Sequence, residues 1–110
     1  MGDEKYLGKV PTECSVEEAN KAARLAVLTR LAVIKSELGS INQVARIVSV
    51  SGFVNAAPDF TDHPQVVNGA SDLLVEIFGE IGKHSRTAVG CSSLPLGVAV
   101  EISLIVEVKP

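Results

Sequence analysis

The sequence predicts an α+β fold in which two helices pack on one face of a mixed β-sheet. Two stretches carry apolar residues at helical spacing, residues 16–38 and 64–81. Three stretches have the β-branched composition or the alternation of strands, residues 44–55, 84–91 and 98–108. The chain has 110 residues and shows no internal repeat or linker, so one domain is expected over residues 1–110.

The first helix is expected to begin at a capping box. Ser15 is followed three residues later by Glu18, so the serine hydroxyl accepts a backbone N–H while the glutamate reaches back. Gly39 supplies a left-handed C-terminal stop, which predicts a helix over Val16–Leu38. Its buried stripe is expected to contain Ala23, Val27, Leu31, Ile34 and Leu38. The polar residues 1–14 predict an N-terminal arm, or an edge strand at Tyr6–Val10.

Residues 44–55 predict a strand that is buried on both sides, because both of its faces are largely apolar. One face is assigned Val44, Val48, Val50 and Val54, and the other Ala45, Ile47, Ser49, Ser51 and Phe53. A second helix follows, with Thr61 or Asp62 as its cap and Pro64 in its first turn. Gly79 and Gly82 are expected to end it.

The last two strands are expected to be joined around residues 92–97. In the final strand one face carries Val98, Val100, Ile102, Leu104, Val106 and Val108, and the other carries Ala99, Glu101, Ser103, Ile105 and Glu107. Glu101 therefore points away from the main apolar layer but has small and apolar neighbours, which predicts partial burial. A second sheet face this apolar is rarely exposed to solvent in a monomer, so self-association is expected.

Composition excludes several classes of protein. The net charge is −3 and no basic stripe is visible, which argues against a nucleic-acid binder. No apolar run reaches the ~18 residues of a membrane span, and the first ten residues lack the apolar core of a signal peptide. Cys14 and Cys91 are far apart and have no metal-like spacing, so they are interpreted as free thiols of a cytoplasmic protein.

One spacing carries more information than composition. Arg86 opens a strand, Leu94 and Pro95 lie in the following turn, and Val100-Glu101-Ile102 lies on the next strand. This arrangement resembles the signature of the YjgF/RidA proteins, also known as L-PSP endoribonucleases. Further landmarks agree with it at Phe53-Val54, Asp59-Phe60, Val67-Asn68 and Phe78, so the resemblance spans residues 15–108. It implies a chorismate mutase-like sandwich and a homotrimer with ligand clefts between subunits.

The resemblance also implies roles for individual residues. Arg86 corresponds to an arginine that binds the carboxylate of a small imino or keto acid, with a backbone N–H near Ala88 as a second donor. Glu101 corresponds to a glutamate that activates water or transfers a proton. The implied reaction is hydrolysis of 2-aminoacrylate-type intermediates to 2-keto acids and ammonia, without metal or cofactor. The reactive cysteine position of the family is Ala88 here, so Cys91 is interpreted as a small packed residue.

The residues alone leave other interpretations open. From the residues alone, Arg86 is better explained by a salt bridge at a subunit interface, to Glu101 among other acids, and Glu101 is compatible with pairing to a lysine. His63 and His84 are interpreted as caps or solvated residues, and Asn68 as a structural hydrogen-bonding residue.

Members of the family usually open with a hairpin and a third strand that line the cleft, and this chain is expected to begin after them. The alternatives are therefore a non-catalytic carboxylate-binding or assembly subunit, and an endoribonuclease or translation inhibitor, against which the acidic charge and the lack of a histidine pair argue.

Overall fold

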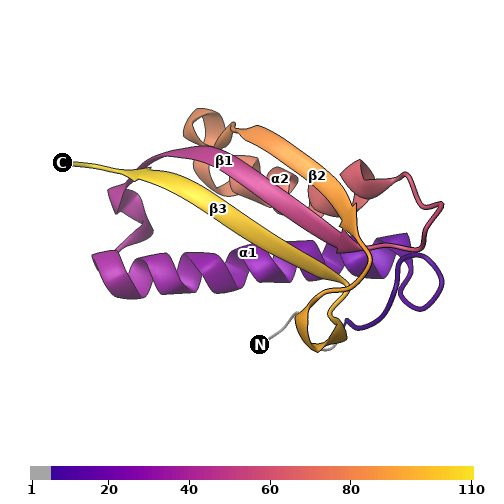
Figure 1. Ribbon diagram of the computed structural model, residues 1–110. Helices are drawn as coiled ribbons and strands as arrows, with labels where there is room; N and C mark the ends of the chain where they lie inside the picture. The colour runs from indigo at the N-terminus through magenta and orange to yellow at the C-terminus, as the bar shows by residue number, and fades with distance from the viewer. Residues whose placement is uncertain (1–5) are drawn as a thin grey trace.

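The computed structural model describes residues 6–110 and places two helices against one face of a three-stranded sheet (Figure 1). The elements are α1 (Val16–Leu38), β1 (Val44–Asn55), α2 (His63–Phe78), β2 (Ser85–Cys91) and β3 (Val100–Val108). Short 3₁₀ turns cover Ile41–Gln43, Gly79–Gly82 and Pro95–Gly97. The predicted element order and the predicted two-layer α+β architecture are confirmed.

Helix α1 has the predicted bounds and the predicted caps. The Ser15 Oγ accepts from the Glu18 backbone N–H at 3.1 Å, and the Glu18 carboxylate accepts from the Ser15 backbone N–H at 3.0 Å. Gly39 adopts φ +85° and donates to the Lys35 carbonyl at 2.7 Å, which ends the helix. The buried stripe is richer in alanine than predicted: it contains Ala19, Ala22, Ala23, Ala26, Val27 and Leu31.

The small residues of α1 allow α2 to approach closely. A Cβ at Gly69 would lie 2.0 Å from the Asn20 carbonyl oxygen, so only glycine fits at this contact. The Asn20 side-chain amide donates to the Gln65 carbonyl at 2.8 Å and ties the two helices together. As predicted, α2 follows Asp62 and has Pro64 in its first turn, although the Asp62 side chain makes no capping bond. Both helices cover the same face of the sheet (Figure 1).

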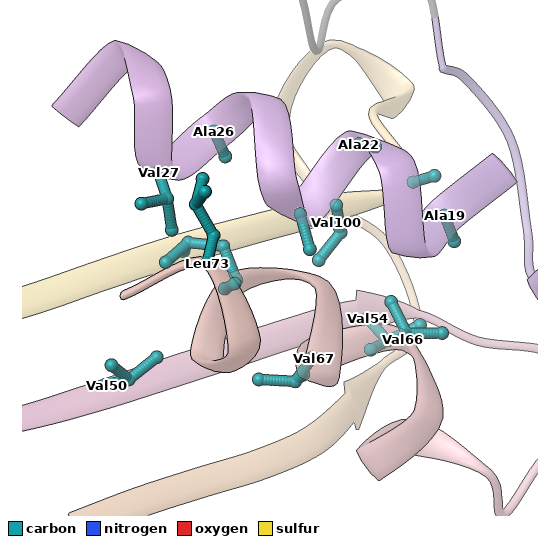
Figure 2. Packing of buried hydrophobic residues seen from close by; sticks show 14 of the residues in the cluster. Ala19, Ala22, Ala26, Val27, Val50, Val54, Val66, Val67, Leu73 and Val100 are labelled. Atoms are coloured by element: carbon teal, nitrogen blue, oxygen red, sulfur yellow. The ribbon is translucent and has the colours of Figure 1, made fainter. Parts of the chain in front are cut away.

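The sheet has the strand order β2-β1-β3 and is mixed, as predicted. Strands β1 and β2 are parallel and are connected through α2, whereas β3 returns antiparallel to β1. The core lies between this sheet and the helices, where Val50, Val54 and Val100 meet α1 and α2 (Figure 2). The predicted alternation of β3 is confirmed at Val100 and Ile102, which are buried beside a half-buried Glu101.

The predicted face of Ile47 is wrong. Ile47 is fully buried in the core, although strict alternation places it opposite Val50. The pairing of β1 with β3 shifts between Val44 and Arg46 and again between Ile47 and Ser49. Each irregularity inserts a residue without a cross-strand partner and so reverses the side on which the following residues point. Val44 and Ile47 can therefore both face the helices, and the two-residue period resumes at Ser49.

The N-terminal segment packs on the sheet without forming a strand. Leu7 makes an isolated antiparallel bridge to Val98, and Val10 makes an isolated parallel bridge to Ala56. Val10 is fully buried and belongs to the core. Residues 1–5 of the predicted arm lie outside the described residues. Within residues 6–110, neither helix is long and apolar enough to cross a membrane.

Candidate functional site

Arg86 is held on the helix side of the sheet by α2. It pairs with Val50 in the register of β2 with β1, and directly paired residues point to the same face. Its Nη1 donates to the Asn68 Oδ1 at 2.7 Å and to the Ser71 Oγ at 3.3 Å. The structural hydrogen bond predicted for Asn68 is therefore present, with Arg86 as its donor. Within residues 6–110 the Nε and Nη2 groups have no partner, so one edge of the guanidinium is available to a ligand.

A histidine completes the support of this arginine. The Nδ1 of His84 lies 2.6 Å from the Gly82 carbonyl oxygen, and its Nε2 lies 2.9 Å from the Ser71 Oγ. A carbonyl only accepts, so Nδ1 carries the proton, and in the neutral ring the Ser71 hydroxyl donates to Nε2. The Ser71 oxygen thus links His84 to Arg86. The sequence does not single out Ser71; its one signal is a position three residues after Asn68, on the same face of a helix.

A shallow hollow of about 260 Å³ opens beside Arg86. It is lined by Ser71, Asp72, Val75, Lys83, His84 and Arg86. The Lys83 ammonium is paired with the Glu80 carboxylate at 2.9 Å, whereas Arg86 makes no ion pair within residues 6–110. An unpaired, exposed guanidinium whose planar fork is fixed on one side is suited to a small carboxylate.

Glu101 lies on the opposite face of the sheet from Arg86. Glu101 pairs with Phe53 of β1, whereas Arg86 and Leu104 both pair with Val50. Phe53 and Val50 are separated by an odd number of positions along β1, so their side chains point to opposite faces. The Glu101 side chain is half-buried, as predicted. It lines a groove of about 400 Å³ along the free edge of β3, together with Arg30 and Val33 of α1. No hydrogen bond or ion pair joins Glu101 to another residue of 6–110, so the salt bridge to Arg86, which the sequence suggested at a subunit interface, is not made within one copy.

The remaining residues singled out from the sequence are Ala88 and the two cysteines. Ala88 lies two residues after Arg86, half-buried on the same face, opposite Gly52. Cys91 is a free, half-buried thiol, and Cys14 is a free thiol in the core. Within residues 6–110, no three side chains of histidine, cysteine, aspartate or glutamate are grouped closely enough to hold a metal ion.

Comparison with known proteins decides the family. A family described as "YjgF/chorismate mutase-like, putative endoribonuclease" matches residues 1–108. The chain belongs to this YjgF family. It is 41% identical to "Protein TCP17" of Trypanosoma cruzi over 103 residues, which are 93% of this chain and 64% of that protein. The chain thus spans less than two thirds of this relative's length.

Solved structures of the YjgF fold agree with the architecture. The Agrobacterium tumefaciens protein Atu1372, described as having unknown function, superposes with a TM-score of 0.92 at 39% identity, over 94% of this chain and 67% of that one. A Shewanella oneidensis protein described as a putative endoribonuclease gives 0.89 at 35% identity, over 94% and 68%. The YjgF resemblance drawn from Arg86 and Glu101 and the predicted chorismate mutase-like fold are confirmed.

Proposed function

We propose that this YjgF protein is a RidA-like deaminase that hydrolyses 2-aminoacrylate-type enamines and imines to 2-keto acids and ammonia. The observation that carries the proposal is the guanidinium of Arg86. It is fixed through Nη1 by Asn68 and Ser71, it has no ion pair within residues 6–110, and it borders a hollow of small-molecule size. Two parallel N–H donors remain for a substrate carboxylate, with a backbone N–H near Ala88 as a further donor.

Once the carboxylate is bound, the reaction requires few further protein groups. The enamine takes up a proton at carbon and becomes an iminium, whose carbon is open to attack by water. Glu101 accepts a proton from that water as it attacks. The carbinolamine then loses ammonia, and a 2-keto acid remains. Every atom comes from the substrate and water, so the reaction needs neither metal nor organic cofactor.

The placement of the two residues bears on assembly. Arg86 and Glu101 point to opposite faces of one sheet, so one copy does not bring them to one substrate. The outer face also exposes apolar side chains, with Ile105 60% and Val89 40% accessible. We therefore propose a homotrimer in which Arg86 of one copy and Glu101 of the next share a cleft. Light scattering should give three times the 11.5 kDa chain mass at micromolar concentration, and a monomer or dimer would contradict the proposal.

The activity test uses 2-aminoacrylate generated enzymatically and follows keto-acid release. Arg86→Ala should abolish the protein-dependent acceleration. Arg86→Lys should weaken binding of 2-ketobutyrate about tenfold, because an ammonium lacks the planar two-point grip and one charge-assisted hydrogen bond contributes about 1.5–3 kcal/mol. Lys83→Ala, in the same hollow but already paired to Glu80, is the matched control and should retain activity. Equal rates for wild type and Arg86→Ala would refute the assigned site.

Two other functions remain as outcomes of this test. Binding of 2-ketobutyrate that depends on Arg86, without turnover of 2-aminoacrylate, would identify a non-catalytic carboxylate-binding subunit. Endoribonuclease activity is suggested by the description of the Shewanella relative. A histidine acid–base pair for RNA cleavage is not assembled within one copy, because His63 begins α2 and His84 follows its far end, about 24 Å along the helix. RNA cleavage that persists on repurification and disappears in Arg86→Ala would favour that activity instead.

A further inference from the structure

Another cavity, of about 560 Å³, lies at the opposite end of β2 from Arg86. Strands β1 and β2 are parallel and both end here, at Asn55 and Cys91, and α2 begins here at His63. It is lined by Lys9, Ala56, Ala57, Pro58, Phe60, His63, Gly90, Cys91 and Ser92. The carboxyl ends of neighbouring parallel strands and the start of the helix between them form a common ligand position, because the helix N–H groups point outward there.

The Lys9 ammonium is held in place at this cavity. It donates to the Asn55 Oδ1 at 3.2 Å and to the Ser92 carbonyl oxygen. Asn55 is only 5% exposed, and its amide group donates to the Val98 carbonyl at 3.2 Å, so the acceptor is itself fixed. Both partners of Lys9 are neutral, and one of its three N–H groups remains. The nearby Glu13 carboxylate accepts from the Lys9 backbone N–H at 2.9 Å, yet no carboxylate of residues 6–110 pairs with the ammonium.

His63 adds a second polar group to the same cavity. Its ring packs edge-on against Phe60, with ring centroids 5.2 Å apart and planes at 78°. Neither ring nitrogen has a hydrogen-bond partner within residues 6–110, although the side chain is half-buried. The ring lies against Gly90, where a Cβ would come 2.6 Å from Nε2. Gly90 therefore provides the space that the imidazole occupies at the cavity wall.

From these features we infer that the cavity is a second ligand site, which binds a small organic carboxylate. The carboxylate accepts the free N–H of Lys9 and an N–H of His63. The carbon body lies on the apolar wall formed by Ala56, Pro58 and Phe60, which favours an organic anion over inorganic phosphate. Cys91 follows Arg86 by five residues, about 16 Å along the strand, so this site is separate from the proposed deaminase site.

Cys91 supplies a local reporter of this site. Cys91 lines the cavity, whereas Cys14 is 3% exposed and its pKa is raised by burial and then by Glu18, which keeps that thiol protonated. Iodoacetate and iodoacetamide are nearly equal in size, but only iodoacetate carries a carboxylate. The full chain is alkylated with each reagent, and modification of Cys91 is followed by peptide mass spectrometry. The rate with iodoacetate is divided by the rate with iodoacetamide. This ratio is then normalised by the same ratio measured for glutathione.

We expect the normalised ratio to be about 10 in the wild type, because one charge-assisted hydrogen bond gives a factor of about this size. It should fall to about one in Lys9→Gln, whose amide retains donors for Asn55 and Ser92, and should be unchanged in Lys83→Gln. A ratio near one in the wild type, or an equally high ratio in Lys9→Gln, would overturn the proposal.

A competition measurement on the wild type does not depend on any variant folding. Butyrate should slow alkylation of Cys91 by iodoacetate in a saturable way. Phosphate competing as well as butyrate, or butyrate having no effect, would overturn an organic carboxylate as the ligand. The outcome is independent of the deaminase, because neither Arg86 nor turnover of 2-aminoacrylate enters the measurement.

Discussion

Val100 and Glu101 are neighbours on β3, yet they lie in different environments. Val100 faces the helices and is 1% exposed, and the alanine-rich surface of α1 covers it (Figure 2). Glu101 faces the other way, where Phe53 lies opposite it and Ile105 is 60% exposed. The strands are apolar on both faces, but helices cover only one within residues 6–110. One face thus provides the stability of a single copy, and we propose that the other provides the contacts between copies and presents Glu101 to the Arg86 of a neighbouring copy.

The largest effect should come from placing a charge on the covered face. Val100→Asp should prevent folding, because a buried unpaired carboxylate costs several kcal/mol against a total stability of about 5–15 kcal/mol. Glu101→Ala should leave the fold intact and remove activity. Circular-dichroism melting curves check both variants. Equal melting temperatures would mean that the two faces are not distinguished as described.

A smaller effect is expected where the helices touch. Gly69→Ala places a methyl group 2.0 Å from the Asn20 carbonyl oxygen, and overpacking of this kind costs about 1–3 kcal/mol. Alanine favours a helix by about 1 kcal/mol over glycine, which offsets part of that cost. Urea unfolding should therefore show a net loss. Glu76→Ala, which removes an exposed ion pair to Arg24 between the same helices, should change stability by less than about 1 kcal/mol.

The smallest effect concerns the start of α1, and it depends on pH. Hydrogen bonds from Ser15, from its backbone first and then from its side chain, lower the pKa of Glu18. A lowered folded-state pKa stabilises the protein above the ordinary carboxyl pKa, and this contribution is lost as the pH falls through the folded-state value. Glu18→Ala should therefore destabilise the protein more at about pH 7 than at about pH 3, because it removes the carboxylate that both hydrogen bonds from Ser15 stabilise. Urea titrations at both pH values test this, and an equal loss at both would show that the charge of the glutamate plays no part.

The sequence was most informative where one local rule decides the outcome. Ser15, Glu18 and Gly39 each act within one turn of α1, so both ends of that helix were predictable. Ile47 was assigned to the wrong face because a bulge depends on pairing with β3, which lies more than fifty residues later in the chain. Arg86 and Glu101 became candidate site residues only through family resemblance. Their placement on opposite faces depends on register, and the contact of Ser71 with His84 joins residues separated by the α2–β2 connection.

We propose that Arg86 and Glu101 of different copies share one site. The most direct test is to co-express Arg86→Ala with Glu101→Ala and compare the mixed oligomers with each variant alone. In a cyclic trimer each site combines two neighbouring copies, and random mixing fills both positions correctly in about a quarter of sites. The mixed oligomers should therefore show about one quarter of wild-type keto-acid release, although each variant alone is inactive. Mixed oligomers as inactive as the separate variants would contradict it, because both residues would then act within one copy or not together at all.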